Sequence, residues 1–445
     1  MNSKNTLKKV AVVGFGAASI GYVNELKDKD VELHIFERSK DIISSSLSGI
    51  RSDGKLFISK EMGGKLDLDL EIQKDIVDFY LKKSEVPEGK IEHGYSFKSK
   101  TDQYYKQFYV NGFEPVNSEF FHIGTDYLKN VMNNIFNDFE SRKNIIFHFN
   151  SKITNIEQFG EKVKIKLINK TSNTKTDSGG EKEIEEFFDK AIIGVGRSGH
   201  KLVQNIKKDH PKILLSSNSV DLGVRFEVPN HIVDELNKEM YEFKVKMETK
   251  TGYLVRTFCN NPSGYVTLER YNDNEFATVN GHSKVKSKTE NTNFAILVTH
   301  KFTEPFNDPI GYGTHIAKLS NILAGGKKVT LQKYSDFKNE KRTKQLGRVT
   351  PTLPKENYIL GDLNLVFPSK TKESIIDFLE KLNDVVPGIT AHDNLLYGVE
   401  VKFYSNMLDN DYFDNIKFIG DCSGWSRSIT YATGHGILEA RKEKF

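Results

Sequence analysis

The stretch from Lys8 to Arg38 reads KKVAVVGFGAASIGYVNELKDKDVELHIFER. An apolar run, Val10–Val13, leads into the turn Gly14–Ser19, and a helix-like segment follows. A second apolar run, Val31–Phe36, then ends at Glu37. This order of strand, glycine turn, helix, strand and acidic residue is typical of a dinucleotide-binding βαβ unit.

Each part of this pattern has a physical task. Gly14 allows a tight turn out of the strand, and Gly16, which lacks a Cβ, allows a pyrophosphate to approach the backbone. The helix that begins there directs free N–H groups and its positive dipole end at the phosphates. Glu37 lies 21 residues beyond Gly16, close to the roughly 20 expected for a carboxylate that binds the adenosine ribose. Ser19 occupies the position of the third glycine and is small enough to keep the helix close to the strand.

Two other interpretations compete with a dinucleotide site. The stretch could be an ordinary βαβ unit with an incidental acidic residue. Lys8-Lys9, followed by apolar residues and then Ala17-Ala18-Ser19, also imitates a secretion signal. A secretion signal would leave Glu37 and the second apolar run unexplained, so we favour the dinucleotide site.

Length and composition describe a water-soluble chain of two or three domains. It has 445 residues, of which 37% are hydrophobic, and a mean hydropathy of −0.50. No apolar run approaches the roughly 20 residues of a membrane span, so we expect no membrane association. The 64 basic and 60 acidic residues are interspersed, which argues against a nucleic-acid partner.

The cysteines and histidines exclude several kinds of chemistry. The two cysteines, Cys259 and Cys422, form no Cys-x-x-Cys pair, so dithiol exchange is excluded. The 12 histidines show no metal-binding spacing, and we expect no metal site. Two thiols without a secretion signal favour a reducing, cytoplasmic setting.

The middle of the chain combines helix and strand signals. Residues 125–141 carry apolar residues at helical spacing. Residues 145–149 indicate a strand, and residues 152–157 and 162–168 indicate antiparallel strands. An exposed hairpin loop at 169–183 comes after them. The strand Lys190–Ile193 follows. The sequence therefore predicts an α/β fold with a small antiparallel meander.

A second glycine pattern, Gly194-Val195-Gly196-Arg197-Ser198-Gly199, follows this strand. It could mark a separate nicotinamide site or a plain turn. A nicotinamide site requires an apolar strand with an acidic end about 20 residues later, whereas Ile213–Leu215 is followed by serines. We therefore predict a strand that ends beside the first dinucleotide, with its glycines allowing close approach.

The C-terminal region provides a second signal. Residues 415–421 form a strand pattern that ends in Gly420-Asp421, a glycine and serine loop follows, and residues 429–441 have helical spacing. A carboxylate at a strand tip can bind the ribityl hydroxyls of a flavin. A helix N-terminus capped by Ser426 or Ser428 can face the flavin pyrimidine edge, which gains negative charge on reduction. The alternative is a surface loop and helix without a ligand.

These residues resemble the FAD-binding superfamily that includes glutathione reductase. More narrowly, the chain is similar to the bacterial group known as uncharacterised FAD-dependent dehydrogenases. The resemblance covers nearly the whole chain, although relatives usually carry glycine at position 19 and Ala-Thr-Gly at 194–196. It rests on Gly14–Ser19, Glu37-Arg38, Arg51–Leu56, His122–Asp126, Gly196–Ser198, Leu222–Glu227, Asn280–Ser283, Tyr397–Glu400 and Gly420-Asp421.

The resemblance implies FAD bound in an extended form. The pyrophosphate would lie on Gly14, Phe15, Gly16, Ala17 and Ala18. The ribose would lie on Glu37 with Arg38 beside it, and the adenine near the backbone of Ile153. Gly196 would approach the cofactor, Asp421 would bind the ribityl chain, and Ser428 and Ile429 would face the isoalloxazine.

The same resemblance implies a fold with an insertion. A Rossmann-like FAD-binding domain would comprise residues 1–215 and 398–445, with an inserted α+β substrate domain at 216–397. Strands are expected at Tyr265–Arg270 and Phe294–Thr299 and a loop at Lys284–Asn293.

The sequence assigns no catalytic residue but offers four candidates. Lys55 is the first candidate for an acid or base, and His122, Arg225 and Tyr431 rank below it; a structural role is the commoner one for each. Cys422 beside Asp421 could approach the flavin, although a buried inert thiol is the commoner case.

We therefore expect an FAD-dependent oxidoreductase that transfers a hydride between flavin N5 and a small-molecule substrate, with NADH or NADPH as a candidate electron donor. The alternatives are a nicotinamide-dependent dehydrogenase without flavin and a non-catalytic FAD-binding module. A tRNA-modifying flavoenzyme would need basic clusters that this sequence does not show. The substrate, the direction of reaction and the oligomeric state stay open.

Overall fold

The computed structural model describes most of the chain. The described residues are 7–42, 54–87, 89–97, 99–100, 102–124, 127–169, 183–216, 219–271, 275–284, 287–303, 305–306 and 308–444. Parts of three motifs used above, Arg51–Asp53, Thr125-Asp126 and most of the 169–183 loop, lie outside them.

The chain divides into two compact units. Unit 1 comprises Met1–Glu92, Phe121–Ser217 and Ser405–Phe445, and unit 2 comprises His93–Phe120 and Asn218–Tyr404. Unit 1 is therefore assembled from three separate stretches of chain. The mixed α/β class expected from the sequence is confirmed.

A five-stranded parallel sheet forms the centre of unit 1. Its order is β23 (Ile416–Phe418), β11 (Lys190–Ile193), β1 (Lys8–Val13), β2 (Val31–Phe36) and β7 (Ile145–His148). Each neighbouring pair is parallel. Strands from the beginning, middle and end of the chain thus lie side by side, and their carboxyl ends share one edge.

Both faces of this sheet are covered, so its strands are apolar on both sides. On one face, Val10 and Val12 pack in a core with helices α1, α2, α4 and α10. On the other face, Ala11 and Val13 pack with the antiparallel sheet β8, β9 and β10 and with helix α5. These helices and strands are α1 (Ala17–Leu26), α2 (Leu70–Ser84), α4 (Leu128–Glu140), α5 (His200–Asp209), α10 (Ile429–Arg441), β8 (Ser151–Phe159), β9 (Lys162–Asn169) and β10 (Glu183–Phe188).

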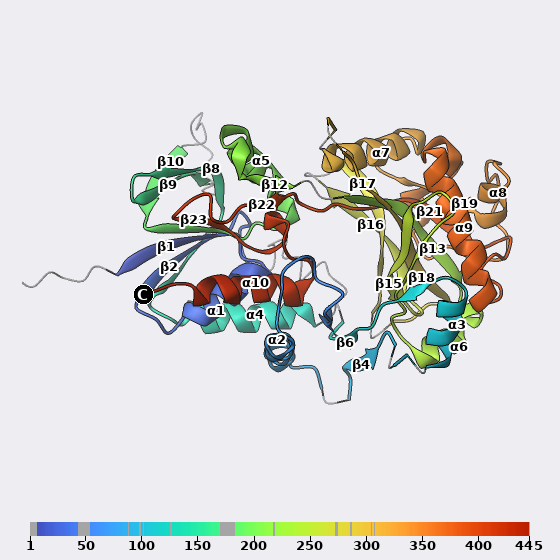
Figure 1. Ribbon diagram of the computed structural model, residues 1–445, viewed down its shortest axis with the longest axis horizontal. Coiled ribbons are helices and arrows are strands. Elements are labelled where there is room, and N and C mark those ends of the chain that lie inside the picture. The colour runs from blue at the N-terminus through green and yellow to red at the C-terminus, as the bar shows by residue number, and fades with distance from the viewer. Residues whose placement is uncertain are drawn as a thin grey trace, which may run out of the picture. The chain divides into compact units, whose positions relative to one another are not determined.

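Helices α1 and α10 are in backbone contact (blue and red in Figure 1). A Cβ on Gly436 would lie 1.9 Å from the carbonyl oxygen of Ala18, and one on Gly21 would lie 2.1 Å from that of Thr433. Only glycine fits at these two positions. The packing brings the N-terminal helix of the glycine turn against the helix at the other end of the chain.

Unit 2 is built on an eight-stranded sheet of order β20-β19-β21-β13-β18-β15-β14-β5. These strands are β5 (Glu114–Pro115), β13 (Val220–Pro229), β14 (Val245–Glu248), β15 (Leu254–Asn261), β18 (Asn291–His300), β19 (Val329–Lys333), β20 (Tyr358–Leu360) and β21 (Leu395–Lys402). A separate hairpin pairs β16 (Tyr265–Tyr271) with β17 (Phe276–His282).

The large sheet has an apolar face and a polar face. Alternate residues of β13, Leu222, Val224, Phe226 and Val228, pack with the helices of unit 2. Residues between them include Asp221, Arg225 and Glu227, which are buried on the opposite face. The helices are α3 (Gln103–Val110), α6 (Asn230–Glu239), α7 (Pro309–Leu323), α8 (Tyr334–Lys338) and α9 (Ser369–Val385).

A β-bulge in β21 changes which residues reach the polar face. Val224 pairs with Gly398, whereas the preceding residue, Gly223, pairs with Glu400, so Val399 is an extra residue in the ladder. Tyr397 and Glu400 are separated by an odd number of positions and yet lie on the same face. The bulge therefore places the Glu400 carboxylate beside Arg225.

The fold corrects three details of the sequence prediction. Residues 93–120, assigned to the N-terminal part, belong to unit 2 because β5 pairs with β14 and Phe108 and Phe113 pack in its core. The boundary drawn at 397 divides β21, which continues to Lys402. The loop predicted at 284–293 is shorter, because β18 begins at Asn291.

Among the described residues, no helix is both long and apolar enough to cross a lipid bilayer. The remaining elements are β3 (Lys55–Ile58), β4 (Glu92–Tyr95), β6 (Glu119–His122), β12 (Leu214–Ser216), β22 (Met407–Leu408) and short 3₁₀ turns at Arg197–Gly199, Pro211–Ile213, Lys355–Asn357, Leu363–Leu365 and Gly420–Ser423.

We predict that Gly436→Ala destabilises the protein by about 1–3 kcal/mol, because the new methyl group overpacks the contact with Ala18. Denaturant unfolding of purified protein measures this change. Lys74→Ala at an exposed position of α2 is the control and should change stability by less than about 0.5 kcal/mol. Equal stability of Gly436→Ala and the wild type would contradict the close packing of α1 and α10.

Candidate functional site

The candidate site lies at the carboxyl edge of the parallel sheet, where ligands of open α/β sheets bind. The turn after β1 carries Gly14 and Gly16, and β2 is followed by Glu37. The turn after β11 carries Gly194 to Arg197, and the one after β23 carries Gly420-Asp421. Four segments that are distant in sequence therefore meet at one edge.

The glycine turn after β1 has the shape of an anion cradle. Gly14 has a φ of +87°, and a Cβ there would lie 3.0 Å from the Gly194 carbonyl oxygen. Among the described residues, a Cβ on Gly16 would lie within 4 Å of the Gly194 carbonyl oxygen alone, at 3.9 Å. In the part of the chain that the structure describes, no side chain caps α1, so the N–H groups of its first turn are candidate donors to a phosphate.

The Glu37 carboxylate lies beside this turn and is 7% exposed. One oxygen accepts a hydrogen bond from the Phe15 N–H at 3.2 Å, and the other accepts one from the Ser39 N–H at 2.9 Å. The Phe15 N–H is thus engaged by Glu37, so an anion at this turn would have to use the N–H groups that follow it. Each carboxylate oxygen keeps a lone pair for a ribose hydroxyl.

Ser19 and Gly194 compensate for each other in size. Ser19 is fully buried, and a Cβ on Gly194 would lie 2.4 Å from its Oγ. The serine that departs from the usual third glycine therefore fits because position 194 has no side chain. Helix α1 and strand β11 stay in close contact despite this departure.

The C-terminal segment completes the edge. Gly420 has a φ of +72°, and a Cβ there would lie 2.7 Å from the Ala18 Cβ, so Gly420-Asp421 lies against the first turn of α1. Asp421 follows, with its carboxylate 3.5 Å from the Arg197 guanidinium. Burial raises the pKa of Asp421, while the charges of Arg197 and Arg427 act in the opposite direction.

His435 fixes this segment and was missed by the sequence analysis. Its Nδ1 accepts a hydrogen bond from the Gly420 N–H at 3.2 Å. Burial lowers the pKa of His435 to about 4, so the ring is neutral and Nδ1 can act as an acceptor. The signal that the sequence offered was the position of His435 between Gly434 and Gly436. Glycines on both sides indicate that this histidine lies on the closely packed side of α10.

The N-terminus of α10 is prepared for a polar ligand. Ser428, with a φ of +74°, caps the helix by accepting from the Tyr431 N–H at 3.4 Å, which confirms the predicted cap. Two buried hydroxyl oxygens beside it, Ser426 Oγ and Thr430 Oγ1, have no hydrogen-bond partner among the described residues. Buried polar atoms of this kind normally have partners, so these two hydroxyl groups mark the N-terminus of α10 as a candidate contact for a polar ligand.

Cys422 is an unreactive thiol. Its Sγ donates to the carbonyl oxygens of Ile193 and Ile419, each at 3.1 Å. Burial raises the pKa of the thiol to about 12. Because only the thiolate is a strong nucleophile, Cys422 is not poised for covalent attachment of a flavin.

The remaining residues that were predicted to bind the cofactor also lie in unit 1. Arg38 is exposed at the end of β2, and Ile153 is buried in β8. Gly196 has a φ of +57°, and no atom of the described residues lies within 4 Å of where its Cβ would be. Ala17 begins α1, and Ile429 begins α10.

The four catalytic candidates are all buried. Lys55 is 3% exposed at the start of β3, and His122 is 2% exposed, 3.3 Å from Glu92. Tyr431 donates its hydroxyl proton to the Ser59 carbonyl oxygen at 2.7 Å. Arg225 is fully buried in unit 2.

Arg225 connects motifs from three parts of unit 2. Its Nε and Nη2 donate to the two carboxylate oxygens of Glu400, each at 2.8 Å. Nη2 also donates to Asn280 at 3.0 Å, and Nη1 to the Cys259 carbonyl oxygen at 2.9 Å. The motifs around Leu222–Glu227, Asn280–Ser283 and Tyr397–Glu400 therefore share one buried network.

The second glycine pattern does not form a second βαβ unit. Helix α5 follows Gly199, but the next strand, β12, pairs antiparallel with β22 outside the parallel sheet. A nicotinamide site would require a further parallel strand beside β11, and β23 occupies that position in the sheet.

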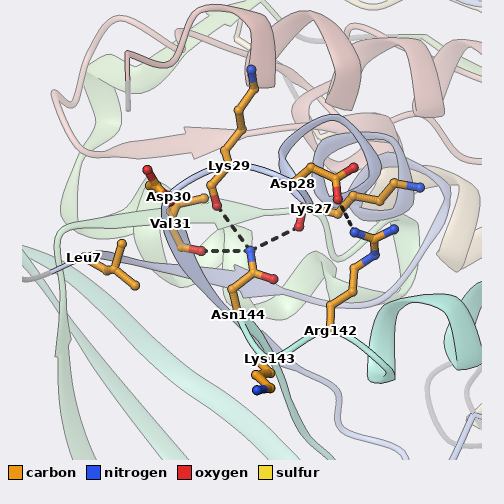
Figure 2. A pocket seen from close by; sticks show the side chains of 9 residues that line it. All are labelled: Leu7, Lys27, Asp28, Lys29, Asp30, Val31, Arg142, Lys143 and Asn144. Atoms are coloured by element: carbon orange, nitrogen blue, oxygen red, sulfur yellow. Dashed lines mark hydrogen bonds and ion pairs between the residues drawn. The ribbon is translucent and has the colours of Figure 1, made fainter.

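A surface hollow at the opposite, amino edge of the parallel sheet is drawn in Figure 2. There Asn144 donates to the carbonyl oxygens of Lys27, Lys29 and Val31 at 3.2–3.3 Å, and Arg142 pairs with Asp28. These contacts fix the turn between α1 and β2. The hollow is therefore a structural feature, remote from the glycine turn.

Comparison with known proteins supports a flavin. Residues 219–403 match the family described as "FAD-dependent protein, C-terminal domain-like", a range close to the continuous part of unit 2, Asn218–Tyr404. This match supports FAD as the cofactor, as the sequence analysis expected. No curated protein matches the chain.

Solved structures show a distant likeness only. A flavoprotein/dehydrogenase from Cytophaga hutchinsonii is 8% identical with a TM-score of 0.43, covering 98% of this chain and 76% of that one. A 2,6-dihydroxypyridine-3-hydroxylase from Arthrobacter nicotinovorans is 13% identical with a TM-score of 0.40, covering 98% and 82%. Likeness at this level says nothing about the reaction.

We predict that Gly194→Ala destabilises the protein by about 1–3 kcal/mol and that adding Ser19→Gly restores most of the loss. The new methyl group needs the space that the Ser19 hydroxyl fills. A double-mutant cycle measured by denaturant unfolding tests this coupling. Additive effects of the two substitutions would show that the residues are energetically independent.

We predict that His435 makes the protein less stable in acid. Its pKa is about 4 when folded and 6.5 as the ordinary value, so its contribution is complete above pH 6.5. As the pH falls from about 6.5 to 4 the unfolded state binds the proton first, and stability falls by about 3 kcal/mol. His435→Asn keeps an acceptor for Gly420 and should lose this component.

Unfolding free energies measured from pH 7 to pH 4 test this prediction. His231→Asn at an exposed position is the matched control and should follow the wild type. Identical pH profiles for His435→Asn and the wild type would show that His435 protonates freely in the folded state.

Proposed function

We propose that the chain is an FAD-dependent oxidoreductase in which unit 1 binds the cofactor and unit 2 contributes to substrate binding. The observation that carries the proposal is the meeting of the glycine turn with Gly420-Asp421 at one sheet edge, fixed by the contact of Gly420 with Ala18. The family match over unit 2 supports the same cofactor independently.

Two groups of residues in unit 1 would bind the two ends of the cofactor. The first turn of α1 would bind the pyrophosphate through backbone N–H groups, and Glu37 would accept hydrogen bonds from the adenosine ribose. Asp421 would bind the ribityl hydroxyls, with Arg197 sharing its charge. The N-terminus of α10, with Ser426 and Thr430, would face the pyrimidine edge of the ring.

Bound FAD would supply hydride transfer at its N5 atom, so the protein needs no nucleophilic triad. The chain's own residues would bind, orient and exclude water. Lys55 stays our first candidate for an acid or base. Tyr431 is less suited, because its hydroxyl proton is donated to the Ser59 carbonyl oxygen.

The direction of electron flow can be tested directly. Anaerobic mixing of the FAD-loaded protein with NADH or NADPH, followed by flavin absorbance, distinguishes a reductase from the alternatives. Rapid bleaching would support a nicotinamide donor. A protein that carries FAD but is reduced by neither nucleotide would be a dehydrogenase of another substrate or a binding module.

We predict that Glu37→Gln weakens FAD binding about tenfold or more, because a hydrogen bond to a charged group contributes about 1.5–3 kcal/mol. The glutamine keeps one acceptor for the glycine turn and therefore preserves the fold better than alanine does. Titration of the apoprotein with FAD, followed by flavin fluorescence, measures the dissociation constant.

Glu32→Gln on the same strand is the matched control, since Glu32 pairs with Lys9 away from the turn, and it should bind FAD like the wild type. Unchanged affinity in Glu37→Gln would remove Glu37 from the ribose site. Purified wild-type protein that holds no flavin and acquires none from added FAD would refute the proposed function.

A further inference from the structure

A surface hollow in unit 2 is lined mainly by basic side chains. It has a volume of about 610 Å³ and lies beside helix α8, which is labelled in Figure 1. Four of its lining residues carry a positive charge and one carries a negative charge, so the lining has a net charge of +3. We call this hollow, with the residues that follow, the basic hollow. They are Lys333, Asp336, Lys341, Arg342, Lys344 and Gln345.

The acidic residues of this stretch are already engaged by other groups. The Asp336 carboxylate accepts a hydrogen bond from the Thr343 hydroxyl at 2.7 Å and lies 3.7 Å from Lys333 Nζ. Glu340, which does not line the hollow, pairs with Lys372 on α9. Asp336 therefore balances Lys333, and the positive charge of the other three cations stays in excess.

Lys341, Arg342 and Lys344 carry this excess charge. In the part of the chain that the structure describes, none of the three pairs with a carboxylate. Arg342 Nη2 donates to the Leu360 carbonyl oxygen at 3.4 Å, and a guanidinium has further N–H groups for an anion. All three residues are exposed, so an anion can reach them from solvent without displacing a carboxylate.

Hydrogen bonds fix the backbone of the loop that carries these three cations. Thr343 is fully buried, and its hydroxyl accepts from the Lys333 N–H at 3.0 Å while it donates to Asp336. The Lys341 N–H donates to the Asp336 carbonyl oxygen at 2.8 Å. Arg342 lies between these two fixed residues. A fixed backbone lowers the entropy cost of gathering the cations around one ligand.

The size and charge of the basic hollow indicate the kind of ligand. Its volume of about 610 Å³ lies within the roughly 300–1,000 Å³ of small-molecule sites. A ligand that matches a net charge of +3 carries two or more negative charges. Ammonium groups bind phosphate oxygens as point charges, and a guanidinium binds them through two N–H groups.

We propose that the basic hollow binds a small molecule that carries a pyrophosphate or triphosphate group. Lys341, Arg342 and Lys344 supply the charge that the phosphates neutralise, and Thr343 holds the loop in place. Every residue of this site belongs to unit 2, whereas the residues proposed for FAD belong to unit 1. The site therefore goes beyond the proposed function and does not depend on it.

Calorimetric titration of the FAD-loaded, full-length protein with sodium pyrophosphate tests the proposal. Bound FAD keeps the glycine turn of unit 1, the other candidate phosphate site, occupied during the titration. We expect saturable binding of one pyrophosphate per chain, with an affinity that falls as sodium chloride is raised, because the charges are exposed and are screened by salt.

Two variants with the same net charge separate the basic hollow from general electrostatics. The test variant combines Lys341→Gln, Arg342→Gln and Lys344→Gln and should raise the dissociation constant about tenfold, since three exposed charge pairs are lost together. The control variant removes three exposed lysines outside the hollow and should bind like the wild type. It combines Lys201→Gln, Lys238→Gln and Lys327→Gln.

Lys344→Gln alone keeps the test decisive if the triple variant fails to fold, and it should weaken binding about two- to threefold. Wild-type protein that binds no pyrophosphate, or equal affinities in the test and control variants, would overturn the proposal. Vesicles of phosphatidylserine and a single-stranded oligoribonucleotide present phosphates in other forms. Tighter binding of either than of pyrophosphate, lost in the test variant, would overturn the assignment to a small molecule.

Flavin absorbance of each sample keeps this proposal apart from the proposed function. Full flavin content without pyrophosphate binding would overturn the basic hollow as a site and leave the flavoenzyme standing. Pyrophosphate binding that is lost in the test variant, in a protein that acquires no flavin, would support the site and refute the flavoenzyme.

Discussion

The backbone contact between α1 and α10 is the constraint on which the candidate cofactor site depends. At Gly21 and Gly436 the two helices approach so closely that a single methyl group would collide with a carbonyl oxygen. This contact, with that of Gly420 against Ala18, fixes the glycine turn relative to the C-terminal carboxylate. Neither half would form a cofactor site alone, because the phosphate donors and Asp421 come from opposite ends of the chain.

A similarly close contact occurs between Ser19 and Gly194. The motif usually has glycine at position 19 and a larger residue at position 194, whereas this chain has Ser19 and Gly194. The spacing between α1 and β11 is therefore preserved. Ser19, which weakened the match to the motif, is thus accommodated by the absence of a side chain at position 194. It leaves the N-terminus of α1 at the sheet edge, where its dipole can act on a phosphate.

The main feature of unit 2 is a network of buried charged groups. Arg225 can be completely buried because a bidentate carboxylate and two further oxygens satisfy its donors. The bulge at Val399 makes this possible, since strict alternation along β21 would turn Glu400 toward the apolar core. A one-residue irregularity therefore decides which face carries the ionic network.

The sequence predicted those parts of the fold whose signals are local. The opening βαβ unit, helix α4, strands β8 and β9 and helix α10 follow from hydrophobic periodicity and glycine positions. It did not predict that residues 93–120 join unit 2, because one two-residue strand and a few buried aromatic residues decide this. Contacts between residues distant in sequence were also missed, because nothing near His435 in the sequence shows that it accepts from Gly420, and nothing near Arg225 shows that it pairs with Glu400.

The three-part construction of unit 1 has a consequence for synthesis on the ribosome. All of unit 2 has been translated when Tyr404 emerges, so its eight-stranded sheet can form while the chain is still growing. Strand β23 and helix α10 emerge only afterwards. Among the described residues, β23 is the strand that covers the outer edge of β11, and α10 packs against α1. A nascent chain that ends before residue 405 therefore exposes an apolar surface and an open sheet edge, which residues 405–445 cover later.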